Sequence, residues 1–354
     1  MDTTDPGLLP GTRLPVAAAA GASFALSALG AYWLARDVPN PLDRPDRKFS
    51  SALAAYPDGW ANGIFLTCAV IALAGALWLL ASRRARAVVP WVAGASIVAL
   101  LMLMDGSNLI LAGYLPAILV GSVLGFDEVN PSVLLSPGLA LQLTLLCTVA
   151  AFGVIIAGRL RLGLGDTGPA VTEAERARRL ARAKARTRFW TKIAIEAPAL
   201  YALTRVLMFF CVPGFDMFGF GEPILWAGLG LAVSAAAGAW LTSGLIRPWG
   251  EVFPRWIPVL RGRRVPIRLA VVPGLVVAVM VATTAKDLLL TFATSDSALT
   301  AVTDWPLVTL PMLLWPLWAF ALAMAAAAYG LRRRLSEAEP APVSRSGNSE
   351  PDVG

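Results

Sequence analysis

Five ionisable side chains lie inside long apolar runs of the sequence: Asp105, Glu196, Arg205, Lys286 and Asp287. Charged groups at membrane depth are costly and usually face a protein interior or a wet cavity, so each is a candidate functional residue. By the helical rise, Glu196 lies about 6 Å from Lys192 and can reach the membrane surface, so it needs no special role. The other four lie deeper, about 20 to 28 Å from the cytoplasmic start of their helices.

These deeper charges predict an outward-facing polar pocket. Glu196 and Arg205 fall on opposite faces of one helix, so Arg205 is expected to act as counter-charge to the acids of other helices. Thr283, Thr284 and Thr291 lie three or four residues from Asp287 and therefore share its face of the helix. The predicted pocket comprises Asp105, Asn108, Arg205, Thr283, Thr284, Lys286 and Asp287. The alternative is a structural ion-pair cluster, with Lys286 extended to the outer membrane surface.

Several kinds of chemistry are disfavoured. The chain contains no His, the most common general base and transition-metal ligand. Cys68, Cys147 and Cys211 are widely spaced within apolar runs, which fits neither a disulfide framework nor a zinc site. The two deep acids lack the Tyr-Asp and Gly-x-Gly-Asp motifs of aspartyl intramembrane proteases. We therefore expect no metal, no cofactor and no catalytic residue.

The elements that carry these residues are predicted to be transmembrane helices. Of 354 residues, 57% are hydrophobic and 15% charged, whereas a soluble domain has about a quarter charged residues. A span needs roughly 20 apolar residues. We expect an all-α, polytopic membrane helix bundle with about eight transmembrane helices. They cover residues 14–34, 60–81, 88–111, 134–157, 193–212, 224–246, 269–292 and 305–330.

Charged connections orient the predicted spans. The Arg-rich connections are 83–86, 159–192, 247–268 and 332–334. They are expected in the cytoplasm, because Lys and Arg are retained on that side. The connections that contain Asp127, Asp216 and Asp296 have no Lys or Arg and are expected outside. Both termini are then cytoplasmic.

One stretch leaves the number of spans open. Asp105-Gly106-Ser107-Asn108 could form a turn, which would make residues 109–126 a ninth span. That arrangement would place the basic segment 159–192 outside, against the charge rule. We therefore expect eight spans, with residues 115–126 as an interfacial or re-entrant segment on the outer face.

Sequence echoes indicate an internal duplication. Ala87-Val88-Val89-Pro90 opens the third span, Ala270-Val271-Val272-Pro273 opens the seventh, and an intramembrane Asp follows each at similar spacing. Two sets of four spans would be parallel repeats, as in some transporters. Chance matching between Ala- and Val-rich helices is the alternative. The predicted divisions are a first half at 1–158, a basic linker at 159–192, a second half at 193–331 and a disordered cytoplasmic tail at 332–354.

The basic linker has a helix-start signal. Thr172 with Glu175 three residues later is a capping-box pattern, so a cytoplasmic helix is expected to begin there. Its Arg side chains either bind anionic lipid head groups or are simply solvated. No nucleic-acid partner is expected.

A second basic connection carries a resemblance. Its sequence runs from Gly244 to Pro258 as GLIRPWGEVFPRWIP and closes with Gly262-Arg-Arg-Val-Pro266. The part from Arg247 to Pro266 resembles a loop of uncharacterised multi-pass membrane proteins from GC-rich Gram-positive bacteria. That resemblance implies no activity. The Trp and Arg side chains favour a position in the cytoplasmic headgroup layer, as a lipid or partner contact or as a simple anchor.

Three functional hypotheses follow. The first is a non-enzymatic accessory or structural protein of a bacterial plasma membrane, with a membrane-protein partner left open. The second is a small-solute permease, coupled or not to protons through Asp105 and Asp287. The third, a lipid-handling enzyme, is disfavoured because no nucleophile–base pair can be assembled without His.

Overall fold

The computed structural model describes residues 13–42, 53, 56–81, 88–109, 111–113, 137–164, 172–215, 222–255 and 258–337. Within these ranges the chain is an all-α helical bundle, as predicted from the sequence, and its only β-type pairing is one isolated bridge.

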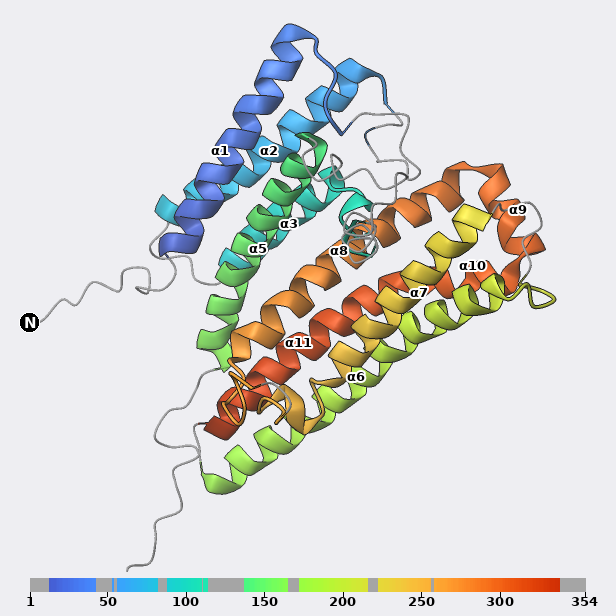
Figure 1. The fold of residues 1–354 in the computed structure, drawn as a ribbon. Coiled ribbons are helices and arrows are strands. Elements are labelled where there is room, and N and C mark those ends of the chain that lie inside the picture. The colour runs from blue at the N-terminus through green and yellow to red at the C-terminus, as the bar shows by residue number, and fades with distance from the viewer. Residues whose placement is uncertain are drawn as a thin grey trace, which may run out of the picture.

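The main helices form two groups (Figure 1). The first group consists of α1 (Arg13–Arg36), α2 (Asp58–Ala81), α3 (Val89–Leu103) and α5 (Pro137–Leu164). The second consists of α6 (Glu173–Phe209), α7 (Glu222–Ser243), α8 (Ile267–Thr294) and α11 (Trp315–Glu337). Two short helices, α9 (Asp296–Asp304) and α10 (Pro306–Leu313), connect α8 to α11.

Five described helical stretches are long and apolar enough to cross a membrane. They are Leu14–Arg36, Gly59–Ala81, Pro137–Ile156, Ile267–Thr294 and Pro306–Glu337, the last formed by α10 and α11 together. In none of them is more than 39% of the most apolar window buried inside the protein. Most of this apolar surface therefore faces outward, where lipid would solvate it, which supports the prediction of a transmembrane protein.

The count of eight spans stays a prediction. α3 and the helix Ser107–Gly113 add a sixth span if this bent pair crosses as one. The predicted spans 193–212 and 224–246 fall on α6 and α7, and the apolar stretch of α7, Gly228–Ser243, is shorter than the others. Residues 115–126, predicted as re-entrant, lie outside the described residues.

Two predicted boundaries fall inside continuous helices. The capping prediction at Thr172 is confirmed: its hydroxyl accepts a hydrogen bond from the Glu175 backbone N–H at 3.3 Å, and α6 begins at Glu173. However, α6 then runs without interruption for 37 residues, so the linker and the fifth span are one helix. Similarly, α11 extends to Glu337, so the predicted tail is helical over residues 332–337.

Small residues allow the helices of the first group to approach closely. A Cβ atom at Gly30 of α1 would lie 3.0 Å from the Phe65 ring of α2. The fully buried Ala69, Ala72 and Ala76 belong to the same core. Close approach over small residues is the usual basis of helix association in lipid, where there is no hydrophobic driving force between helices.

The two groups share part of their packing order. In the first group the contacts form a closed ring, α1–α2–α3–α5 and back to α1, whereas in the second they run as an open series, α7–α6–α11–α8. Three of the helix pairs correspond if the chain is two sets of four spans, but α2 packs on α3 while α7 has no comparable contact with α8 in the described ranges. The correspondence is what the predicted duplication would produce, but the third and seventh spans differ, because α3 ends at Leu103 and α8 continues past Asp287. The duplication therefore stays a prediction.

The Arg-rich connection after α7 folds against the end of α11. It contains a short 3-10 helix (Pro248–Gly250) and a β-bridge between Val252 and Arg264. The hydroxyl of the fully buried Tyr329 donates a hydrogen bond to the Gly250 carbonyl at 2.6 Å. Arg332 forms an ion pair with Glu251 at 2.6 Å. These contacts anchor the connection to the protein itself.

We expect Tyr329→Phe to loosen this connection. The substitution leaves the Gly250 carbonyl without its buried partner, which costs about 1–3 kcal/mol of unfolding free energy. Thermal unfolding in detergent, followed by Trp fluorescence, measures the loss. The exposed Tyr32 supplies the matched control, Tyr32→Phe, which should unfold like the wild type. Equal stability of the two variants would contradict the role of the Tyr329 hydroxyl.

Candidate functional site: a broken helix between the two groups

The candidate site forms where α3 breaks. α3 ends at Leu103, residues 104–106 are extended or turn, and a second helical segment, Ser107–Gly113, leaves at an angle of 76°. Asp105 starts this segment: its Oδ1 accepts hydrogen bonds from the backbone N–H and the hydroxyl of Ser107. Such Asp side chains compete with the helix backbone and favour helix starts, which explains why the apolar run bends here.

The second helical segment inserts into the second group. The Ser234 hydroxyl of α7 donates to the Gly113 carbonyl at 2.6 Å. Leu109 packs on a core cluster that includes Val281 and Ala285 of α8. A Cβ at Gly106 would lie 3.0 Å from the Thr284 methyl group, so the backbone at the break also approaches α8 closely. The break thus joins the two helix groups.

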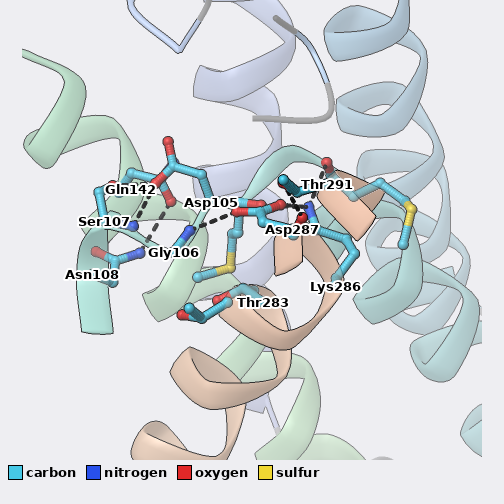
Figure 2. A network of polar contacts seen from close by, with 12 residues as sticks. Asp105, Gly106, Ser107, Asn108, Gln142, Thr283, Lys286, Asp287 and Thr291 are labelled. Carbon is cyan, nitrogen blue, oxygen red and sulfur yellow. Dashed lines mark hydrogen bonds and ion pairs between the residues drawn. The ribbon is translucent and has the colours of Figure 1, made fainter. Parts of the chain in front are cut away.

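A Lys-Asp pair on α8 satisfies both ends of the break (Figure 2). Lys286 Nζ lies 2.6 Å from the Met104 carbonyl oxygen and 3.3 Å from that of Met102, at the end of α3. Asp287 Oδ2 accepts a hydrogen bond from the Gly106 N–H at 2.8 Å. The cation therefore meets free carbonyls and the anion meets an N–H group, the pairing that the helix dipole favours at each end.

Both carboxylates at the break are buried. Asp105 is 1% exposed and Asp287 is 0% exposed. Lys286 Nζ lies 3.1 Å from Asp287 Oδ1, and its side chain is 15% exposed. Lys286 is therefore the counter-charge of Asp287, and it turns inward to the end of α3 instead of extending to the membrane surface.

The predicted role of Arg205 needs correction. Its guanidinium lies 4.9 Å from the centre of the Tyr201 ring, 3.1 Å from the Met208 sulfur and 3.7 Å from the Met312 sulfur. Tyr201 and Met208 belong to α6 itself, and Met312 belongs to α10. The helix α6 packs against α7, α10 and α11. No carboxylate within the described ranges forms an ion pair with Arg205. The structure therefore separates Arg205 from the other predicted pocket residues.

The predicted threonine stripe is present but faces its own helix. The Thr283 and Thr284 hydroxyls both donate to the Met280 carbonyl, at 2.8 and 2.9 Å, and Thr291 donates to the Asp287 carbonyl at 2.9 Å. All three hydroxyls thus bond to backbone one turn earlier. Thr283 and Thr291 lie near the Lys-Asp pair (Figure 2), but their hydroxyl protons are used within α8.

One member of the site was not predicted. Asn108 Nδ2 donates to Gln142 Oε1 of α5 at 3.0 Å, and both side chains are buried. Their remaining amide atoms, Asn108 Oδ1 and Gln142 Nε2, have no partner among the described residues. Gln142 lies in the apolar run 134–157, so a search for uncharged polar side chains in predicted spans would have found it.

The described polar contacts of the break join the two helix groups. An apolar groove between α6 and α10 and a surface hollow on α2 both lie away from the break, and no residue of the break lines either of them. The described residues contain no group of three potential metal ligands. The site's polar atoms mostly contact helix ends and neighbouring side chains.

We expect Gly106→Ala to strain this junction. The added methyl group would lie 3.0 to 3.3 Å from three atoms of Thr284, and overpacking of this kind costs about 1–3 kcal/mol of unfolding free energy. Thermal unfolding should therefore begin at lower temperature. Adding Thr284→Ala removes two of these three atoms, the methyl carbon and the hydroxyl oxygen, and should restore part of the loss. A double variant less stable than the sum of both single effects would contradict this account.

Comparison with known proteins adds no function. No protein-family model, curated protein or solved structure matches the chain.

Proposed function

We propose that this chain is a non-enzymatic integral protein of a bacterial plasma membrane, acting as an accessory subunit or structural component. The main support is how the charged side chains within the predicted spans are paired. Lys286 and Asp287 each bond to one end of the broken helix and form an ion pair with each other. A catalytic or ligand-binding group would instead be expected to face open space.

The chemistry of the described residues agrees with this proposal. The sequence has no His, and the two deep carboxylates are only 0 to 1% exposed. Large apolar side chains cover the outside of the bundle, including Phe24, Trp91 and Trp226, each more than 60% exposed. Such surfaces contact lipid or other membrane proteins.

Purification tests the proposal directly. The chain, carrying a small affinity tag, is extracted from its native membrane in mild detergent and analysed by size-exclusion chromatography and mass spectrometry. An accessory subunit should elute with one membrane protein at a fixed stoichiometry. An isolated chain that moves a solute across liposome membranes would overturn the proposal.

A small-solute permease is the second candidate, and the helix break favours it. Transporters commonly place their binding sites at discontinuous helices between two halves. Here the break carries two buried carboxylates, and the adjacent Asn108 and Gln142 each keep one amide atom without a described partner. Proton movement into proteoliposomes, read with an internal pH dye, tests coupling through Asp287. A signal equal to empty liposomes under all imposed gradients would reject this candidate.

The cytoplasmic placement of both termini also belongs to the proposal. A single Cys at Arg182, an exposed position on α6, reports the side of the membrane after Cys68, Cys147 and Cys211 are replaced by Ala. An impermeant maleimide should label it only after the cells are broken. Labelling in intact cells would reverse the orientation and place the basic half of α6 outside.

A further inference from the structure

We infer that the end of α3 and the Asp287 carboxylate form a binding site for a small monovalent cation, which the protein fills with the ammonium group of its own Lys286. The inference is independent of the proposed function, because it concerns which ligands the break can hold in either case.

The atoms around Lys286 Nζ form an oxygen-only site. They are the Met104 carbonyl at 2.6 Å, the Asp287 carboxylate at 3.1 Å and the Met102 carbonyl at 3.3 Å. An ammonium group has three N–H donors; here two of them donate to the Met104 and Met102 carbonyls, and the Asp287 carboxylate forms an ion pair with the same group. The same set, two backbone carbonyls and one carboxylate, is typical of oxygen ligands for small hard cations.

The break of α3 makes the two carbonyls available. In a continuous helix each carbonyl accepts a hydrogen bond from the residue four positions later, and the last turn of any helix leaves carbonyls without that partner. The negative end of the helix dipole also lies here and attracts positive charge. Unwound backbone and half-helix ends are the groups that coordinate Na⁺ in discontinuous transport helices.

An ion with a single positive charge is the natural replacement, because it preserves the charge that the Lys286 ammonium group brings to the break. Asp287 is fully buried, and Lys286 supplies the one cation that faces it within the described residues. Removing the Lys side chain leaves this carboxylate without its counter-charge, which strongly favours uptake of a replacement cation. Because the Lys286 side chain is 15% exposed, its removal opens a path to the carbonyls from outside the cluster.

Lys286→Ala tests the site, with thermal unfolding in detergent as the readout. The purified variant is measured in NaCl, KCl, NH₄Cl and choline chloride at equal ionic strength. Na⁺, K⁺ or NH₄⁺ should raise its unfolding midpoint in a saturable manner, by roughly 2–4 °C relative to choline, which is too large for the site. The wild-type midpoint should be the same in all four salts.

Two controls separate specific binding from general salt effects. Lys192→Ala removes an exposed Lys from α6 and should show no difference between the salts. Adding Asp287→Asn to Lys286→Ala removes the carboxylate ligand and should abolish the response. If Lys286→Ala does not accumulate, Lys286→Gln keeps a neutral donor for the Met104 carbonyl and is measured in the same series. A folded Lys286 variant equally stable in all four salts, or a wild type that responds as strongly, would overturn the inference.

Discussion

Replacing Asp287 with Ala should cause the largest loss of stability that a single side chain can produce at the junction. The Gly106 N–H would lose its acceptor and Lys286 would keep a charge without its counter-ion. Removing one partner of a buried ion pair typically costs about 3–5 kcal/mol, because the other charge remains buried. We expect little folded protein after detergent extraction, measured by fluorescence-detected size-exclusion chromatography.

Asp304→Ala is the matched control, because Asp304 is exposed at the end of α9. It should elute and unfold like the wild type. The stability of Asp287→Asn should lie between those of Asp287→Ala and the wild type. Its amide oxygen can still accept the hydrogen bond from the Gly106 N–H, but it does not neutralise Lys286. If Asp287→Ala were as stable as Asp304→Ala, the Lys-Asp pair would not be what joins the two groups.

A second test separates the charge from the packing. Replacing both members together, as Lys286→Met with Asp287→Leu, removes the two charges and leaves apolar side chains of similar size. Exchange of a buried ion pair for apolar residues is often neutral, so the double variant should recover part of the stability lost in Asp287→Ala. It should still be weaker than the wild type, because the ends of the broken helix lose their partners.

Gly250→Ala should disrupt the Arg-rich connection after α7 with an effect of similar size. A Cβ atom at Gly250 would overlap the Gly244 carbonyl oxygen, far inside van der Waals contact. The turn between Gly244 and Gly250 must therefore move, which also displaces the carbonyl bound by Tyr329. We expect a loss above the usual ~1–3 kcal/mol of overpacking, seen as a lowered midpoint in thermal unfolding.

Gly230→Ala is the corresponding control within α7. A Cβ at Gly230 would meet no atom within 4 Å, and Ala favours a helix by about 1 kcal/mol over Gly. This variant should be as stable as the wild type or more stable. A Gly250→Ala protein that matched it would show that the Gly244–Gly250 contact can relax without cost.

The helices and the location of the polar cluster were predictable, because both depend on local sequence. Apolar length identifies a candidate span, and a charged residue within it is visible at once. Asp105, Lys286 and Asp287 were predicted on this basis, and Asn108 by its position one turn from Asp105; the structure brings all four together. The turn-forming sequence Asp105-Gly106-Ser107-Asn108 likewise indicated a break in α3 as one of two possibilities.

Which charged side chains of the cluster pair with one another was not predictable from their spacing in the sequence. Lys286 and Asp287 are consecutive and therefore leave α8 about 100° apart, which gave no reason to pair them. The long Lys side chain nevertheless reaches back over the end of α3. Arg205 had a suitable depth for pairing with Asp287, but its helix packs on a different face of the second group.

The sequence by itself determined an all-α chain with several long apolar helices, a helix start at Thr172 and the residues that carry charge within the apolar runs. Only the tertiary structure decided that α3 bends into the second group and that Lys286 and Asp287 satisfy the two helix ends this bend creates. The physical reason is that hydrophobic length and capping act over a few neighbouring residues. Which oxygen a buried ammonium group meets depends instead on helix packing between segments more than 180 residues apart.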